Sequence, residues 1–268
     1  TIDGQKGVKD PVGMNGIRME VDAVIIQTLS SQIKNLTKSV YRTGLDIDDL
    51  VFSPLATAEA VLTNRQKELG VCVVDIGATT TTMAVFEEGD ILHVAVLPIG
   101  GDHITNDIAI GLRTSLDVAE KVKLQIGHAM PDHIDRKEQY ELTDFGSTEE
   151  EIFKRKFIAE IIEARTEELF EAVDDELRKI DRSGMLPVGA VLSGGTVKME
   201  GVIDVAKRVL RLPSTMGIPV EVSSVVDEVS DPAYATSVGL AIWGYEIRSA
   251  SGKRFSIKWS GMNQVADQ

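Results

Sequence analysis

The sequence predicts an α/β protein, because short apolar runs typical of buried strands alternate with segments of helical pattern. Residues 71–74 form one such run, and 82–87 and 91–97 add a second and a third strand. Residues 188–192 form another buried run, which precedes a double glycine and an amphipathic helix at 202–210. A chain of 268 residues is long enough for two domains or one large one.

The turn after the first strand has the composition of a phosphate-binding site. Asp75 ends the strand, and Gly77 and a run of threonines that includes Thr79 and Thr80 follow it. Glycine lets a phosphate approach the backbone closely, and N–H groups and Thr hydroxyls can donate to its oxygens. Asp75 is placed to hold Mg²⁺ through water, since Mg²⁺ keeps most of its hydration. The alternative is an ordinary meander in which these residues only end a strand.

A second glycine turn and a charged pair strengthen the binding hypothesis. Gly194 and Gly195 stand between a strand and a helix, where a ligand can lie against bare backbone. A tight packing turn would explain them equally well in isolation, but two such turns about 120 residues apart favour a site. Glu120 and Lys123 share one helix face at i and i+3, either as ligand contacts or as a solvated pair.

The order of these elements resembles the second half of the actin, heat-shock-ATPase and sugar-kinase superfamily, and within it the FtsA family of bacterial cell-division proteins. The resemblance implies an actin-like (ribonuclease H-like) ATPase fold, represented by its second half and part of the first. The segments GVKDPVGM at 7–14 and GGDHITNDIA at 100–109 point to FtsA, while the glycine turns are shared by the superfamily. Further segments that carry the resemblance lie at 16–21, 53–62, 70–77 and 234–240.

The resemblance implies an ATP and Mg²⁺ site. The superfamily's phosphate loop corresponds to the first turn, its adenosine loop to the second turn, and its ribose and base contacts to the charged pair. The implied residues are Asp75 for the metal, Gly77, Thr79 and Thr80 for phosphates, Glu120 and Lys123 for ribose and base, Gly194 and Gly195 under the adenosine, and Lys198 over the base.

The resemblance also implies a domain plan. The inserted subdomain of the family would end at residue 29, and residues 30–69 would return to the first actin-like domain with its connecting helix. Residues 70–105 and 183–250 would form the second actin-like domain, 106–182 a subdomain inserted in it, and 251–268 a strand or linker. The superfamily's first phosphate loop and the family's membrane-targeting helix have no counterpart here, so we expect an N-terminally truncated fragment.

The implied function is that of an ATP-binding protein that polymerises and links FtsZ filaments to the cytoplasmic face of the membrane at the division septum. The subdomain at 106–182 would receive the C-terminal tail of FtsZ. Ser53 stands where many relatives carry a water-orienting acid or amide, which predicts slow hydrolysis at best and no metabolic enzyme. The alternatives are a pilus-assembly ATP-binding relative and a catalytic phosphotransferase on the same fold. Cationic candidates for tail binding are Lys154, Arg155, Lys156 and Arg165.

Composition excludes some classes of function. The net charge of −14 argues against nucleic acid as a partner, since such proteins need basic patches. No run reaches the roughly 18 apolar residues of a membrane-spanning helix. Cys72 lies within the first strand and is expected in the core. The four histidines show no metal-ligand spacing with one another or with Cys72.

Pattern and turn residues predict the remaining elements. Ser147 and Glu150 have capping-box spacing, so the longest helix is expected to begin at residue 147 and end near 180. Strands are expected at 17–29 and 48–52, helices at 30–43, 55–62, 104–112 and 233–245, and a loop at 213–220.

Overall fold

The computed structural model describes the chain except for residues 6, 9–10, 22, 220–226 and 251–268. It divides into two compact units, Thr1–Ile47 and Asp48–Gln268, which are described separately. The predicted terminal segment 251–268 lies outside the described residues, and the predicted domain boundaries remain predictions.

The first unit contains one helix, α1 (Ser30–Tyr41), within its described residues and near the predicted position. Ile2 forms isolated bridges with Gln5 and Met19. The strand predicted at 17–29 is wrong for the described residues, which form no ladder beyond the bridge at Met19. An extended apolar segment becomes a strand only where another strand pairs with it. Ile17 and Ile25 are exposed instead.

The second unit is built on a five-stranded sheet in the order β3-β2-β1-β6-β7. Its first three strands form the predicted antiparallel meander, and β6 and β7 pair in parallel, β6 directly beside β1. The loop predicted at 213–220 includes the short strand β7. The strand bounds are β1 Val71–Ile76, β2 Thr81–Glu87, β3 Asp90–Leu97, β6 Gly189–Ser193 and β7 Ser214–Met216.

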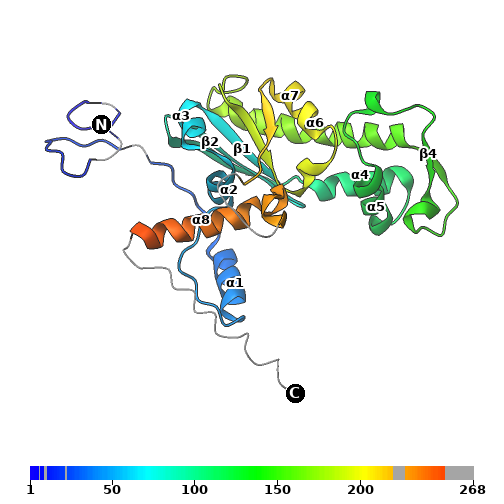
Figure 1. The fold of residues 1–268 in the computed structure, drawn as a ribbon, viewed down its shortest axis with the longest axis horizontal. Helices are drawn as coiled ribbons and strands as arrows, with labels where there is room; N and C mark the ends of the chain where they lie inside the picture. The colour runs from blue at the N-terminus through cyan, green and yellow to red at the C-terminus, as the bar shows by residue number, and fades with distance from the viewer. Residues whose placement is uncertain (6, 9–10, 22, 220–226, 251–268) are drawn as a thin grey trace, which may run out of the picture. The chain divides into compact units, whose positions relative to one another are not determined.

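Helices cover both faces of this sheet (Figure 1). Alternate residues of β1 point to opposite faces: Cys72 and Val74 join the core under α4 to α7, and Val71 and Val73 join the smaller core under α2 and α8. Cys72 is fully buried, as predicted, and burial raises the pKa of its thiol to about 12. The helix bounds are α2 Ser53–Val61, α3 Asn64–Leu69, α4 Gly101–Leu112, α5 Leu116–Ile126, α6 Arg155–Lys179, α7 Val202–Leu210 and α8 Ala235–Ala250.

Short 3₁₀ turns join these elements, and no described helix is long and apolar enough to cross a membrane. The strand predicted at 48–52 is wrong, because this segment runs irregularly into α2. The turns are η1 Pro131–His133, η2 Leu142–Phe145, η3 Gly195–Lys198, η4 Asp227–Ser230 and η5 Pro232–Tyr234.

The predicted start of the longest helix is wrong. Residues 147–154 do not join α6, which begins at Arg155. Instead β5 (Ile152–Lys154) pairs with β4 (Gln139–Glu141), and Phe153 packs near the rings of Tyr140 and Phe145. Ser147 still accepts a local hydrogen bond from the N–H of Glu149. Burial of the aromatic cluster therefore outweighs the capping preference of this segment.

Candidate functional site

The candidate site lies where β1 and β6 end side by side. These strands are parallel, and Asp75 is the register partner of Ser193, so both glycine turns leave the same edge of the sheet. At Gly194, where φ is +92°, a Cβ would lie 2.4 Å from the carbonyl oxygen of Ile76 and 2.6 Å from Oδ1 of Asp75. Glycine is required here because the backbones of the two turns touch.

The first turn is held against the start of α4. The N–H of Gly77 bonds the carbonyl of Thr80 at 3.0 Å, and the N–H groups of Gly101 and Asp102 donate to the carbonyls of Gly77 and Ala78 at 2.9 and 2.8 Å. The first two N–H groups of α4 are thus engaged by protein. In the part of the chain that the structure describes, no hydrogen bond is donated by the N–H groups of Ala78 and Thr79.

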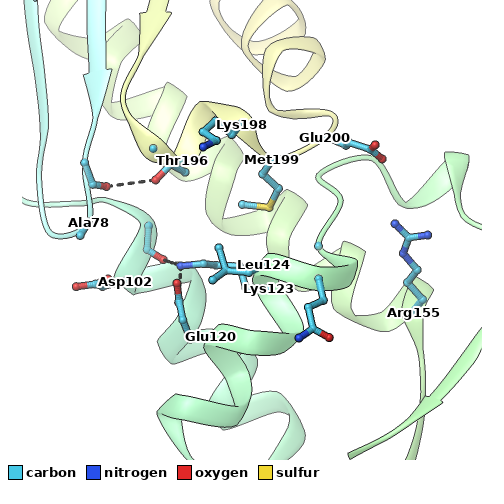
Figure 2. Close-up of a pocket in the computed structure, with 15 residues that line it drawn as sticks. Ala78, Asp102, Glu120, Lys123, Leu124, Arg155, Thr196, Lys198, Met199 and Glu200 are labelled. Carbon is cyan, nitrogen blue, oxygen red and sulfur yellow. Dashed lines mark hydrogen bonds and ion pairs between the residues drawn. The ribbon is translucent and has the colours of Figure 1, made fainter. Parts of the chain in front are cut away.

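A cavity of about 630 Å³ opens between these turns and α5 (Figure 2). It brings together five of the residues predicted from the sequence: Gly77, Glu120, Lys123, Gly195 and Lys198. The other lining residues are Ala78, Gly101, Asp102, Leu124, Gln125, Gly127, Arg155, Thr196, Met199 and Glu200.

The remaining predicted residues lie beside the cavity rather than along it. Thr79 and Thr80 are exposed in the first turn, and Gly194 packs beneath the second turn. Asp75 is partly exposed at the end of β1, where its Oδ2 accepts hydrogen bonds from the hydroxyls of Thr57 and Thr236. Thr79, Thr80, Gly194 and Asp75 are therefore next to the cavity but not among its lining residues.

Glu120 and Lys123 form a local network rather than a solvated surface pair. Nζ of Lys123 lies 2.6 Å from Oε2 of Glu120, and it donates to the hydroxyl of Thr105 at 2.8 Å and to the carbonyl of Gly101 at 3.2 Å. The Lys123 side chain is only 10% exposed, whereas that of Glu120 is 40% exposed. Lys123 thereby fixes Glu120 at the cavity wall and ties α5 to the start of α4.

The same network sets the ionisation of Glu120. Burial favours the neutral carboxyl, but hydrogen bonds from Lys123 and Thr105 together with the charge of Lys123 outweigh it and lower the pKa of Glu120. Glu120 is therefore an anion at neutral pH. An ionised carboxylate can accept hydrogen bonds from a ligand's hydroxyl groups.

Lys198 of the second turn is one of the lining residues. Its Nζ lies 2.6 Å from Oδ2 of Asp231, and this hydrogen bond and that from the N–H of Ala233 lower the pKa of Asp231. Figure 2 shows Met199, next to Lys198, and Leu124 of α5 reaching in from opposite sides. These apolar side chains can flank a flat ring.

Arg155, Glu200 and Gln125 are lining residues that sequence reasoning did not assign to this cavity. Arg155, the first residue of α6, is predicted from the sequence as a cation for peptide binding. Its Nε donates to the carbonyl of Ile126 at 2.8 Å and its Nη1 to Glu138 at 3.1 Å. An isolated bridge between His128 and Glu200 brings the second turn beside the residues after α5. No local sequence pattern predicts such contacts, because they depend on how α5 and α6 pack.

A second surface feature is a groove of about 370 Å³ between α4 and α6. Gly111 lets the helices approach closely, since a Cβ there would lie 2.5 Å from Cδ1 of Ile161. Arg165 makes paired contacts to Asp107 of 2.5 and 2.9 Å. The groove residues are Asp107, Ile110, Gly111, Phe157, Ile161, Ala164, Arg165 and Glu168.

Comparison with known families decides the identity of the fold and the family. The sequence profile described as "Cell division protein FtsA" matches residues 72–239, and that of the "SHS2 domain inserted in FTSA" matches residues 1–27. The chain belongs to the FtsA family of cell division proteins. The predicted family is thus confirmed.

Curated FtsA proteins match almost the whole chain. The chain is 39% identical over 267 residues to cell division protein FtsA of Pseudomonas aeruginosa, covering all of this chain and 63% of that protein. It is 39% identical over 257 residues to FtsA of Bacillus subtilis, covering 96% of this chain and 57% of that protein. The chain therefore spans about 57–63% of the length of these FtsA relatives.

Solved structures confirm the actin-like fold predicted for this FtsA chain. The structure of MreB5 of Spiroplasma citri bound to ADP has a TM-score of 0.68 and 18% identity, covering 85% of this chain and 69% of the other. At that identity the likeness establishes the fold, an α/β actin-like architecture around a central sheet. Membership of the FtsA family favours cell division over the pilus-assembly alternative.

Proposed function

We propose that this FtsA-family chain binds Mg·ATP in the cavity between the glycine turns, and that ATP serves there mainly as a structural ligand. The protein would polymerise and link FtsZ filaments to the cytoplasmic face of the membrane at the division septum. The nucleotide would stabilise the cavity rather than serve as the substrate of a metabolic reaction.

One observation carries the nucleotide proposal: two glycine turns from adjacent parallel strands share one cavity with Glu120, Lys123 and Lys198. Ligands of open α/β sheets bind beyond the carboxyl ends of parallel strands. A volume of about 630 Å³ lies within the usual range for small-molecule sites. The MreB5 structure named above was solved with ADP bound, which supports a nucleotide as the ligand here.

The chain's own groups suit the parts of a nucleotide. The N–H groups of Ala78 and Thr79 and the exposed hydroxyls beside them can donate to phosphate oxygens. Ionised Glu120 can accept hydrogen bonds from ribose hydroxyls. Gly195 has open space above its backbone, because a Cβ added there would have its nearest non-neighbouring heavy atom 4.0 Å away. An adenosine can therefore approach the backbone of Gly195.

The residues also fit a hydrated Mg²⁺. Within the described ranges no three or more His, Cys, Asp or Glu residues gather as a ligand set. Mg²⁺ bound to nucleotides uses one or two carboxylates, phosphates and several waters. Asp75, a partly exposed carboxylate beside the first turn, provides one such group. When bound, the metal would neutralise phosphate charge.

Calorimetric titration with Mg·ATP tests this proposal, using the full-length protein as its gene encodes it. We expect Lys198→Ala to weaken binding by about tenfold, the effect of losing one charged hydrogen bond. Lys207→Ala is the matched control, because Lys207 is an equally exposed, ion-paired lysine outside the cavity. Equal affinity of the wild type and Lys198→Ala would contradict the adenosine-loop assignment.

Hydrolysis followed in the same samples separates the structural role from catalysis. Ser53, the first residue of α2, lacks the charge and reach of the acid or amide that orients water in many relatives. We expect turnover far below the value on the order of 10 s⁻¹ that is typical of enzymes. Turnover at that rate would instead favour the phosphotransferase alternative.

The groove between α4 and α6 is our proposed site for the FtsZ tail. Phe157 and Ile110 are 43% and 76% exposed along it, and Arg165 lines it as a cation paired with Asp107 and Glu168. Of the four cationic candidates, Arg165 is the one that lines this groove, whereas Arg155 lines the nucleotide cavity. An apolar groove suits a peptide that carries apolar anchors, and a carboxylate of that peptide would replace Asp107 or Glu168 on Arg165.

A further inference from the structure

A cluster of three side chains joins the end of β1 to two helices. Oδ2 of Asp75 accepts hydrogen bonds from Thr57 of α2 at 3.0 Å and from Thr236 of α8 at 2.8 Å. The two hydroxyl oxygens lie 2.8 Å from each other. Neither threonine lines the cavity, so neither is explained by direct nucleotide contact.

The surrounding packing holds these hydroxyls in place. Thr57 is fully buried, so water cannot replace its hydroxyl. The helices touch through their backbones, since a Cβ on Gly239 of α8 would lie 1.7 Å from the carbonyl oxygen of Ala56. The helices therefore cannot shift apart without losing this contact. The hydroxyls of Thr57 and Thr236 are thus held in fixed positions beside Asp75.

The two threonines supply only two hydrogens to this cluster. Thr57 and Thr236 own one hydroxyl hydrogen each, yet their oxygens make four close contacts, including one from Thr57 to the carbonyl of Ser53 at 3.1 Å. The strongest acceptor among these groups is an ionised carboxylate. Oδ2 of Asp75 can accept from both hydroxyls, and the contacts of Thr57 with the Ser53 carbonyl and with Thr236 compete for the same two hydrogens.

The other oxygen of Asp75 is differently placed. Across the described portion of the chain, Oδ1 accepts no hydrogen bond that would compete with a ligand. It faces the backbone of Gly194, and the next residue, Gly195, lines the cavity. The two hydroxyls thus fix the carboxylate through one oxygen and leave the second for a hydrated cation.

We propose that Thr57 and Thr236 are positioning residues that orient the Asp75 carboxylate for the Mg²⁺ of bound nucleotide. This inference rests on the proposed nucleotide function. It predicts that the hydroxyls control the magnesium requirement of nucleotide binding, whereas a purely structural role would alter stability alone.

Titration with a fluorescent N-methylanthraniloyl-ATP, in EDTA and over a series of Mg²⁺ concentrations, tests the inference in the full-length protein. We expect Thr57→Val and Thr236→Val each to raise the half-saturating Mg²⁺ concentration by about tenfold, a typical effect of losing an outer-shell partner. Affinity in EDTA should stay at the wild-type value. Thr57→Ser and Thr236→Ser, which keep the hydroxyls, should restore the wild-type Mg²⁺ response.

Thr166→Val is the matched control, because Thr166 is a buried threonine that bonds a helix carbonyl away from the cavity. It should lower the thermal midpoint without moving the Mg²⁺ response. An unchanged Mg²⁺ response in both Thr57→Val and Thr236→Val, or an equal loss of affinity in EDTA and in Mg²⁺, would overturn the inference. A wild-type protein that binds no nucleotide in either condition would instead refute the proposed function itself.

Discussion

Arg155 and Arg165 lie on one helix but line different cavities. Arg155 begins α6 at the wall of the proposed nucleotide cavity, and Arg165 lines the groove between α6 and α4. Ten residues of α-helix separate them, a rise of about 15 Å. The helix therefore carries both proposed binding surfaces, and each arginine can be changed without removing the other.

Charge reversal at Arg165 should abolish tail binding selectively. Arg165→Glu removes the cation that is paired with Asp107 and Glu168 and places a third carboxylate beside them, so an acidic peptide would be repelled more strongly. We expect affinity for a synthetic FtsZ C-terminal tail peptide to fall at least about tenfold by fluorescence anisotropy, with Mg·ATP affinity unchanged. Lys154→Glu, an exposed cation of β5 outside the groove, is the control. Peptide affinity that survives Arg165→Glu would remove Arg165 from the proposed site.

Truncation at Arg155 should have the reverse effect. Arg155→Ala removes a cation from the cavity wall and the contacts that hold the start of α6 to Ile126 and Glu138. We expect calorimetry to show weaker Mg·ATP binding, by about threefold to tenfold, with peptide affinity within twofold of the wild type. Loss of peptide binding alone would mean that Arg155 belongs to the tail site after all.

The sequence was informative wherever a local pattern coincided with burial. The strands around Asp75 and before Gly194 combine unbroken apolar runs with glycine turns, and the structure pairs them as neighbours. The helix prediction for residues 147–154 is wrong because their capping signature is local. The pairing of β4 with β5 and the ring contacts of Phe153 depend on residues outside this segment. Arg155 and Glu200 could not be assigned to the cavity for the same reason, since tertiary packing alone brings them there.

Alanine substitution of the two adjacent glycines of the second turn should have different effects, one on stability and the other on nucleotide binding. Gly194→Ala places a Cβ against the Ile76 carbonyl in a left-handed conformation, so we expect a loss of about 1–3 kcal/mol in unfolding free energy. Gly195→Ala meets only one heavy atom, at 4.0 Å, and should leave stability nearly unchanged while weakening Mg·ATP binding. Chemical denaturation with parallel calorimetry checks both. A destabilised Gly195→Ala that binds ATP normally would make this turn a packing device only.

Glu120 should give the protein a stability increment that disappears in acid. Its pKa is lowered in the folded state: burial opposes ionisation, but hydrogen bonds from Lys123 and Thr105 and the charge of Lys123 outweigh burial. A carboxyl group whose pKa is lowered on folding contributes its full stabilisation above the unfolded pKa of 4.5. This stabilisation is lost as the pH falls through the folded-state pKa.

Glu120→Gln should therefore lower the unfolding free energy near neutral pH, by less than about 1 kcal/mol because the side chain is 40% exposed and solvent screens the pair. The difference from wild type should shrink as the pH drops below 4.5, the ordinary value for glutamate. Glu171→Gln, which removes an exposed carboxylate of α6, is the control for the change in net charge. Denaturant titrations across this pH range provide the measurement. A difference that grows in acid would mean that the carboxylate is not held in its ionised form by Lys123.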